Sequence, residues 1–269
     1  MALACGLGVP ATVNEVAAAD LFAGPSEVTN QVARLPAVSG FNGSLSGMGG
    51  VLDEDGFAAA HLSLATPVPF LDFLGVQVDG LAGTYRSDNI LGGALHIFAR
   101  HPSWGMIGAY GDWGYVSPQH YGRVGPELEI YMGRFSLEAI GGMSFGQNVD
   151  DEVFVDADLA AYATDDFRLS VGYTYSQLGS IAKAGLEYQV PLNSPLAVSL
   201  FAEGRIGEED YAAAWAGLKI YGAREQKSLI RRHREDLLRS RLPSNLAPLT
   251  NCGIKTGEGV FCGSDDDFD

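Results

Sequence analysis

Segments in which apolar and polar side chains alternate follow one another from about residue 38 to residue 221. In 153–163, for example, Val155 falls on one face while Asp156 and Asp158 fall on the other. A period of two is the signature of β-strands. Twelve such segments can be counted, with approximate cores at 40–52, 56–66, 70–85, 89–101, 104–115, 121–133, 135–147, 152–164, 166–178, 180–190, 196–206 and 209–221.

The two faces of these segments differ in charge. One face is free of charge over about ten residues, and the other carries isolated charges in mid-strand. In a membrane barrel the uncharged face meets lipid and the charged face lines the lumen. A tilted strand of about 9–11 residues spans a bilayer, and the sheet must close because unpaired backbone groups cannot face hydrocarbon. These segments therefore predict an all-β fold, a closed antiparallel transmembrane β-barrel of about twelve strands over 38–221.

Composition agrees with a barrel but does not by itself exclude a large soluble β-sandwich. The chain is 46% hydrophobic, with a mean hydropathy of +0.06 and a net charge of −16. It has no run of about 18 apolar residues, so no transmembrane helix is expected. The negative charge lies in residues 1–221, while 222–269 is neutral overall. Without a broad basic surface to meet phosphates, nucleic-acid binding is not expected.

Acidic turns and proline-containing turns between the segments differ in their positions along the chain. An even number of strands places both ends on one side, the periplasm, and the odd-numbered turns outside. Acidic turns fall at the odd positions, at 53–55, 150–152 and 208–210. Proline-containing turns fall at the even positions, at 67–69, 101–102 and 191–195. This sorting predicts a bacterial outer-membrane location in a Gram-negative cell, with both termini periplasmic.

The start of the chain contains features of an export signal. Residues 1–19 end in small residues like those of a signal-peptidase site, and are expected to be a signal-peptide remnant. Residues 20–37 are then an N-terminal periplasmic segment. Cys252 and Cys262 remain after export as a pair ten residues apart, which favours a disulfide bond in an oxidising compartment; two free thiols are the alternative.

Residues 222–269 are predicted to form a periplasmic tail. Its part 224–241 holds 7 Lys and Arg against 3 Asp and Glu, with leucines at roughly helical spacing, and predicts a short basic helix. In one interpretation the helix binds anionic lipid, peptidoglycan or a periplasmic or outer-membrane protein partner through Arg231, Arg232 and Arg234. In the other it is a plug that folds back onto the base of the barrel.

Charged residues on the polar face are the candidate lumen lining. They are His96, Arg100, Glu127, Glu129, Glu138, Asp156, Asp158, Arg168, Lys183, Glu187, Glu203, Arg205 and Lys219. In a conducting pore such a wall biases ion passage, and its carboxylate excess predicts cation preference. The alternative is a lumen cross-linked shut by salt bridges, because twelve strands lie between filled barrels of 8 and open ones of 16–18.

Motifs for catalysis, metals and cofactors give little support for an enzyme. Gly142–Gly146 matches G-x-S-x-G, but that mechanism needs a strained strand-to-helix turn, and here the serine lies within a period-two strand. The acidic turns lack an EF-hand pattern, so no metal site is expected. No cofactor motif is present. The chain is predicted not to be an enzyme, with an outer-membrane lipase as the remaining enzymatic alternative.

Three stretches carry a family resemblance: Ala18–Leu21, the closing Gly217–Gly222, and Lys227–Asp236. With them the chain resembles alphaproteobacterial porin-like outer-membrane proteins. The resemblance implies the fold and location, outer-membrane lipid and lipopolysaccharide as surroundings, and the barrel-assembly machinery as a partner. It does not imply an activity. The leading hypothesis is a channel for ions or small solutes; the second is a structural or assembly barrel with a blocked lumen whose tail binds a partner.

Overall fold

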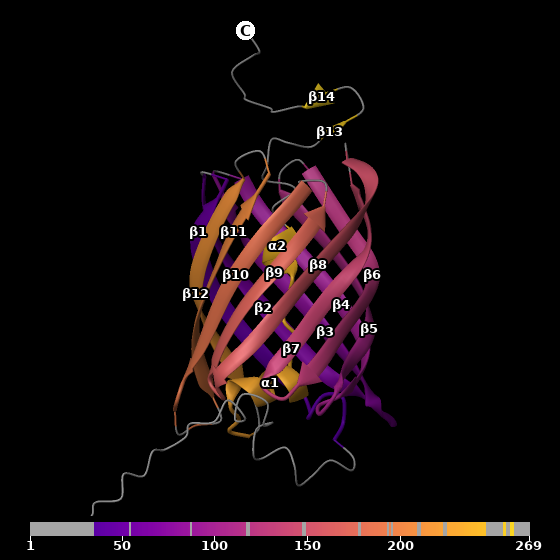
Figure 1. The fold of residues 1–269 in the computed structure, drawn as a ribbon, viewed down its shortest axis with the longest axis vertical. Coiled ribbons are helices and arrows are strands. Elements are labelled where there is room, and N and C mark those ends of the chain that lie inside the picture. The colour runs from indigo at the N-terminus through magenta and orange to yellow at the C-terminus, as the bar shows by residue number, and fades with distance from the viewer. Residues whose placement is uncertain are drawn as a thin grey trace, which may run out of the picture.

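The computed structural model describes residues 35–245, except 54, 87, 117–118, 147–148, 177–178, 193, 195, 209–210 and 223–224, together with 255–256 and 259–260. Twelve antiparallel strands form one closed barrel (Figure 1). They are β1 (Asn42–Leu52), β2 (Asp55–Val68), β3 (Leu71–Tyr85), β4 (Asp88–His101), β5 (Gly105–Val116), β6 (Gln119–Met132), β7 (Phe135–Gly146), β8 (Val149–Thr164), β9 (Phe167–Ser176), β10 (Gly179–Val190), β11 (Ala197–Gly207) and β12 (Ala212–Gly222).

The barrel is built of hairpins, since each strand pairs with its neighbours in sequence. It closes where β1 pairs with β12, in a ladder that runs from Gly43 opposite Gly222 to Leu52 opposite Ala213. Closure removes both sheet edges, so the strands leave no row of unpaired backbone groups to face lipid. The predicted twelve-stranded closed antiparallel barrel is confirmed.

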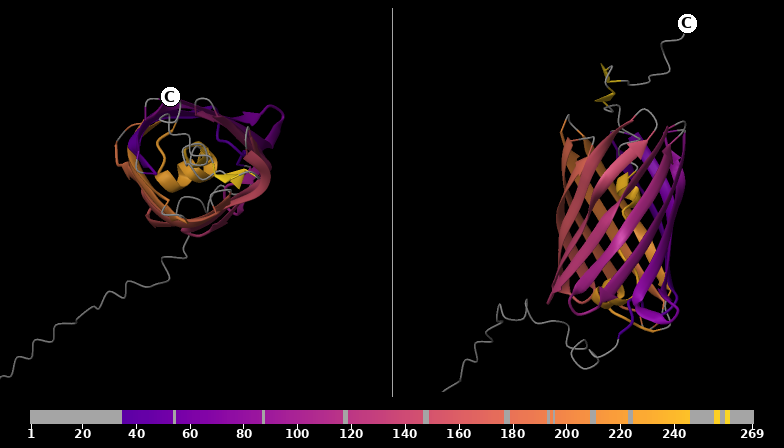
Figure 2. Two further views of the ribbon diagram at one scale, coloured as in Figure 1. Left: turned by 90° about the horizontal axis from the view of Figure 1, so that it is seen from above. Right: turned by 90° about the vertical axis from the view of Figure 1, so that its right-hand side faces the viewer.

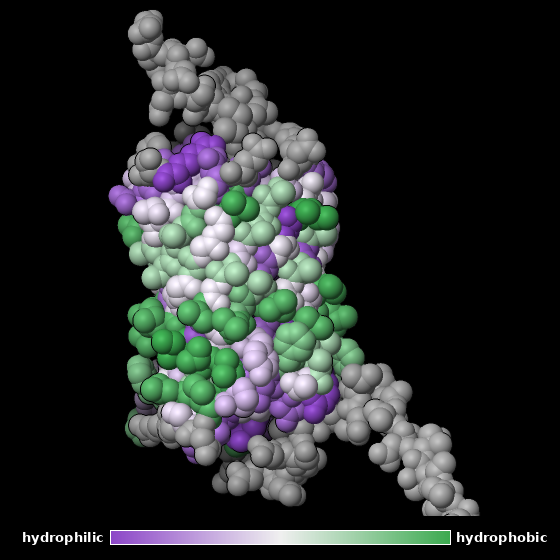
Figure 3. Space-filling model, turned by 90° about the vertical axis from the view of Figure 1, so that its left-hand side faces the viewer, coloured by the Kyte–Doolittle hydropathy of each residue, from purple (hydrophilic) through white to green (hydrophobic). Residues whose placement is uncertain are grey.

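The wall has two chemically different faces, as the alternation predicts. On β9, Leu169 and Val171 are 44% and 61% exposed on the outside, while Arg168 and Ser170, which alternate with them, are buried. Figure 3 shows one side of this wall, mostly green or pale between rims where purple residues gather. The outer face is therefore suited to hydrocarbon and the inner face to polar contacts.

The two ends of the barrel are distinguished by the chain itself. At one end, here called the entry mouth, β1 begins and β12 ends; the other end is called the far mouth. Residues 37–39 fold across the entry mouth, where Ala37 and Val38 are fully buried. The Ala37 N–H donates to the Asp72 carbonyl at 2.6 Å, and the Ser39 N–H donates to the Glu235 carbonyl at 2.8 Å.

After β12 the chain turns into the lumen. Helix α1 (Leu229–Glu235) lies across the entry mouth, an extended stretch follows, and α2 (Leu242–Asn245) lies further up inside the barrel (Figures 1 and 2). Leu242 is fully buried in the same apolar cluster as Leu52 and Tyr85, near the far mouth. A short hairpin, β13 (Lys255–Thr256) with β14 (Gly259–Val260), is drawn beyond that mouth in Figure 1.

This course corrects two sequence-based expectations. The predicted helix 224–241 is restricted to Leu229–Glu235, because the backbone of Leu238 bonds to a wall side chain instead of to its own helix. A tail that hangs into the periplasm is wrong for residues 227–245, which lie in the lumen. None of the helices in the described part of the chain has the length and apolarity to cross a membrane. The predicted signal remnant and the Cys252–Cys262 pair lie outside the described residues.

Candidate functional site

The lumen wall is densely charged. All thirteen candidate residues named from the sequence face inward. Within the described strands the lumen holds nine carboxylates, namely Asp79, Asp112, Glu127, Glu129, Glu138, Asp156, Asp158, Glu187 and Glu203. It holds six Lys and Arg side chains, namely Arg100, Arg123, Arg168, Lys183, Arg205 and Lys219. The wall therefore has an excess of three negative charges if its histidines are neutral.

Residues 227–242, here called the tail plug, carry the opposite charge into the lumen. Inside the barrel the plug has five Lys and Arg side chains, namely Lys227, Arg232, Arg234, Arg239 and Arg241. Its buried carboxylates are Glu235 and Asp236. With Arg231, which pairs with Glu235, the plug has six Lys and Arg against two carboxylates, so its net charge is positive and opposite in sign to that of the wall. Plug and wall are complementary, and each would carry uncompensated charge without the other.

Four wall carboxylates converge on the plug and form what is called here the carboxylate cluster: Glu138, Asp156, Asp158 and Glu203. Glu138 on β7 lies directly opposite Asp158 on β8 in the strand register. Asp156 lies two residues earlier on β8 and therefore faces the same side. Glu203 comes from β11, three strands further around the barrel than β8. The strand period and the closure of the barrel together bring these groups to one level.

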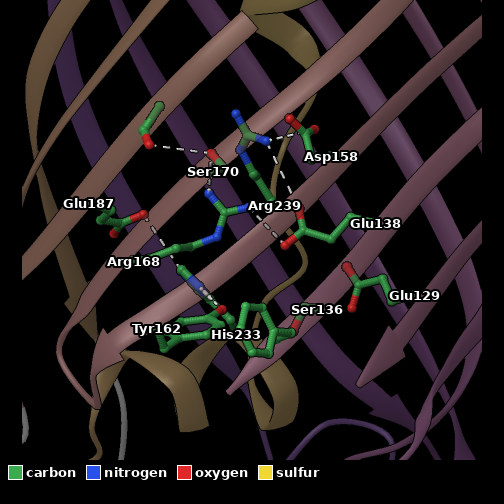
Figure 4. Close-up of polar contacts among 12 residues, drawn as sticks. Glu129, Ser136, Glu138, Asp158, Tyr162, Arg168, Ser170, Glu187, His233 and Arg239 are labelled. Carbon is green, nitrogen blue, oxygen red and sulfur yellow. Dashed lines mark hydrogen bonds and ion pairs between the residues drawn. The ribbon is translucent and has the colours of Figure 1, made fainter. Parts of the chain in front are cut away.

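Two arginines of the plug occupy the carboxylate cluster. Arg239 donates from Nη1 to Asp158 at 2.9 Å and from Nη2 to Glu203. Arg241 donates from Nη1 to both Asp156 and Asp158. Figure 4 shows Arg239 aimed at Glu138 and Asp158. Charge-assisted bonds to buried carboxylates are among the stronger contacts in proteins, so these arginines lock the plug to the wall.

Cations of the wall complete the carboxylate cluster. Lys183 Nζ lies 2.7 Å from Asp156 and 2.9 Å from Asp158. Arg168 donates to Glu138 at 2.8 Å, and Arg205 donates to Glu203. Each carboxylate is thus shared between a cation of the wall and one of the plug. The Oε2 oxygen of Glu138 is buried and accepts no hydrogen bond within the described ranges.

Gly172 makes the contact between Lys183 and Asp158 possible. It lies on β9 directly between the two, opposite Asp158 on one side and Lys183 on the other. A Cβ at this position would lie 2.3 Å from Asp158 Oδ1, 2.5 Å from the Ala157 carbonyl oxygen and 2.6 Å from Lys183 Cε. The absent side chain is therefore a requirement of the carboxylate cluster, and the sequence alternation alone does not reveal it.

Uncharged and backbone contacts hold the plug above and below the cluster. The Gln77 side chain donates to the Leu238 carbonyl at 3.0 Å and accepts from the Leu238 N–H at 2.7 Å. Arg100 donates to the carbonyls of Ala37, His233 and Asp236. These contacts give backbone N–H and carbonyl groups of the plug the hydrogen-bond partners that water would otherwise have to provide.

The base of the plug is also packed. His233 of α1 lies between two wall tyrosines, with Nδ1 2.9 Å from the Tyr162 hydroxyl and Nε2 3.1 Å from the Tyr221 hydroxyl. Burial lowers the pKa of His233 below its ordinary value of 6.5, although Glu187 at 3.6 Å opposes that shift. Of the predicted tail residues, Arg232 and Arg234 bond to the wall, while Arg231 pairs with Glu235 on its own helix.

A second polar network lies near the first strands, and the sequence candidates include only part of it, because Asp79, Asp112 and Arg123 are not among them. His96 bridges Asp79 at 3.0 Å and Glu127 at 2.8 Å, and on β5 Asp112 pairs with Arg123 at 2.7 Å. Asp79 could have been found, because Gln77 and Asp79 alternate with valines; Asp112 lies in a glycine-rich strand whose faces the sequence leaves undetermined. The contacts of His96 and the Asp112–Arg123 pair connect strands of the wall to one another and do not involve the plug.

Little space is left in the lumen beside the plug. The larger inner cavity, of about 80 Å³, lies between the plug and β1, β2, β11 and β12, and a second one is about 10 Å³. The first has room for a few water molecules and the second for hardly one. Among the described residues, the tail plug therefore occupies the lumen between the strands of the wall.

Two other sequence candidates can be placed. Ser144 of the G-x-S-x-G stretch donates to the Glu152 carbonyl at 2.8 Å, while its neighbours Met143 and Phe145 are exposed on the outer face. The Ser144 hydroxyl therefore serves as a hydrogen-bond donor to a neighbouring strand of the wall. No group of three or more His, Cys, Asp or Glu side chains in the described ranges is arranged to hold a metal ion.

Comparison with known proteins gives a fold and no family. No family model and no curated protein matches the chain. Among solved structures, an outer-membrane channel from Pseudomonas putida F1 has a TM-score of 0.53 and 8% identity, and covers 72% of this chain and 98% of that chain. The KdgM porin in complex with disordered oligogalacturonate has a TM-score of 0.51 and 10% identity, covering 65% and 97%. The chain has the fold of porin-like outer-membrane barrels.

Proposed function

We propose that this protein is an outer-membrane channel for ions or small solutes that its own tail plug holds closed. The observation that carries the proposal is the seating of Arg239 and Arg241 in the carboxylate cluster. A structural barrel can be filled by apolar side chains or by wall-to-wall salt bridges. Here wall-to-wall pairs balance only part of the wall's negative charge, and the carboxylate cluster is balanced in addition by a segment that is joined to the barrel through a short connection.

The proposed channel prefers cations when the plug is displaced. The wall then presents its excess of three carboxylates to the lumen, and such an excess concentrates counter-ions. The proposed setting is the bacterial outer membrane, with the entry mouth on the periplasmic side and lipid and lipopolysaccharide around the wall. Insertion by the barrel-assembly machinery belongs to the same proposal.

Single-channel recording of the purified chain in planar bilayers tests this function. The intact chain should pass little current. The full-length variant Arg239→Gln/Arg241→Gln, and a chain truncated after Gln226, should both give stable steps, with a reversal potential biased toward cations in a salt gradient. The matched control is Arg134→Gln, because Arg134 pairs with Asp165 in a turn at the entry mouth and does not touch the carboxylate cluster.

The alternative is a structural or assembly barrel whose lumen never conducts. It is favoured by the small volume of the inner cavities and by the depth to which the plug is buried. A folded barrel that passes no current in any of these variants would contradict the channel and support this alternative. A partner of the tail would then be sought by cross-linking from β13 and β14.

A further inference from the structure

We infer that the carboxylate cluster is a binding site for small organic cations that carry guanidinium or ammonium groups, and that Arg239 and Arg241 occupy it as internal stand-ins for that ligand. This inference rests on the proposed channel and names the substrate class of its lumen.

The first argument is that the site already holds the chemistry in question. Two guanidinium groups from one extended stretch of chain lie in the cluster, and both reach Asp158. Arg239 spans Asp158 of β8 and Glu203 of β11, two strands that are separated by β9 and β10 in the wall. Guanidinium groups present several N–H donors in one plane, and carboxylates on separate strands match that arrangement.

The second argument is an acceptor that the stand-ins leave unsatisfied. Glu138 Oε2 is buried and accepts no hydrogen bond from any residue that the structure describes. It lies 3.9 Å from Arg239 Nη1 and 3.8 Å from Arg241 Nη2, so it faces both guanidinium groups but is bonded to neither. A buried carboxylate oxygen without a donor is costly. A free ligand, not tethered to the plug backbone, can move to satisfy it.

The third argument concerns the kind of cation. Lys183, Arg168 and Arg205 stand between the carboxylates, each bonded to one or two of them. Their positive charges and their use of the carboxylate oxygens disfavour a metal ion, which needs several oxygens around one centre. The carboxylate oxygens that these cations leave available are spread more widely than the ligands of a single metal ion. They suit a ligand that has donors at more than one point.

The consequence is a channel that its own solutes can open. A dication that enters the cluster competes with Arg239 and Arg241 for the same oxygens and thereby shifts the plug toward release. Because the tail is tethered, it competes at a local concentration in the millimolar range. The intact chain is therefore expected to bind such ligands much more weakly than a chain whose plug lacks the two arginines.

Calorimetry with agmatine, which carries one guanidinium and one ammonium group, tests the inference in detergent and needs no conduction. The full-length Arg239→Gln/Arg241→Gln variant should bind agmatine at least about tenfold more tightly than the intact chain does. Tetramethylammonium, a cation without N–H donors, should not bind. In the same background, Asp156→Asn and Asp158→Asn should each weaken agmatine binding, whereas Asp112→Asn, which removes a carboxylate outside the cluster, should not.

Folding and function are controlled separately. The heat-dependent gel mobility of each variant checks that the barrel is closed, and Arg241→Gln alone serves if the double variant does not fold. Agmatine should also raise the melting temperature of the arginine-free variant more than that of the intact chain. Equal binding of agmatine and tetramethylammonium, or equal losses in Asp112→Asn and Asp156→Asn, would overturn the site. Potassium currents without agmatine binding would leave the channel standing and reject this inference alone.

Discussion

Gln77 of β3 and Leu238 of the tail plug exchange two hydrogen bonds, in which the side-chain amide of Gln77 pairs with both backbone groups of Leu238. The wall thereby supplies the plug with the partners that a neighbouring strand would otherwise provide. Gln77 and the carboxylate cluster hold the same extended stretch of the plug. Gln77 does so through uncharged hydrogen bonds, and the carboxylate cluster does so through ion pairs. The pair therefore offers a way to loosen the plug without altering the charge of the lumen.

Replacing Gln77 with leucine should open the channel. With the plug seated in the variant, the N–H and the carbonyl of Leu238 would be buried without partners. Each unsatisfied group costs about 1–3 kcal/mol of stability of the seated state. Since about 1.4 kcal/mol changes an equilibrium tenfold, open probability in single-channel records should rise roughly tenfold or more. Ser144→Ala is the control, because Ser144 bonds only to the neighbouring strand. Equal currents from Gln77→Leu and the intact chain would exclude a role for this pair in closure.

Replacing Gly172 with alanine should damage the carboxylate cluster. The new Cβ would meet Asp158 and Lys183 at less than van der Waals distance, and the Ala157 carbonyl as well. We expect a lower midpoint of urea unfolding and more frequent channel openings, because both the wall pair and the contact of Asp158 with the plug are displaced. Gly204→Ala is the control, since a Cβ there meets nothing within 4 Å. A Gly172→Ala protein as stable and as closed as Gly204→Ala contradicts this account.

Charge reversal should change selectivity only when the lumen is open. In a chain truncated after Gln226, changing Glu127, Glu129, Asp156 and Asp158 to lysine should move the reversal potential from cation toward anion preference. The same truncation carrying Asp55→Lys, at the start of β2 beside the far mouth, should keep the cation preference. The reversal potential in a tenfold salt gradient measures both. An unchanged reversal potential in the fourfold variant would place the ion path elsewhere.

Acidification should favour release of the plug through His233. Burial lowers the pKa of His233 below 6.5 in the seated plug, so the released plug binds the proton more readily. This contribution to closure is present above about pH 6.5 and is lost as the pH falls through 6.5 toward the lowered value. Glu187, Arg168 and Lys219 also face His233 and move its pKa in opposite directions.

Open probability recorded between pH 7.5 and 5.5 measures the effect of His233. The intact chain should open more often at the acidic end, and His233→Gln should show a flatter dependence on pH, because glutamine does not titrate. His101→Gln is the control, since His101 lies in an exposed turn beside Trp104. If His233→Gln follows the same pH curve as the intact chain, the gating protons bind elsewhere.

The strands could be predicted because their information is local. In β8 to β11 the charged inward residues lie between apolar outward ones, so the period of two identifies both the strand and its lumen-facing side chains, Lys183 and Glu187 among them. In β5 the glycines remove that contrast, and Asp112 was missed for that reason; its partner Arg123 lies on β6. The number of strands and their length then implied closure, because an open edge cannot remain in hydrocarbon.

The course of the tail could not be predicted in this way. Its sequence shows a basic segment that needs anionic partners, and lipid, a protein or the barrel itself would all have supplied them. Arg241 meets Asp156 across 85 positions of sequence, and Arg239 meets Glu203 across 36. Only the closed barrel brings carboxylates of β7, β8 and β11 to one level inside a lumen wide enough for one extended chain. The sequence determined the wall and its charge, and the tertiary structure decided that the chain itself neutralises that charge.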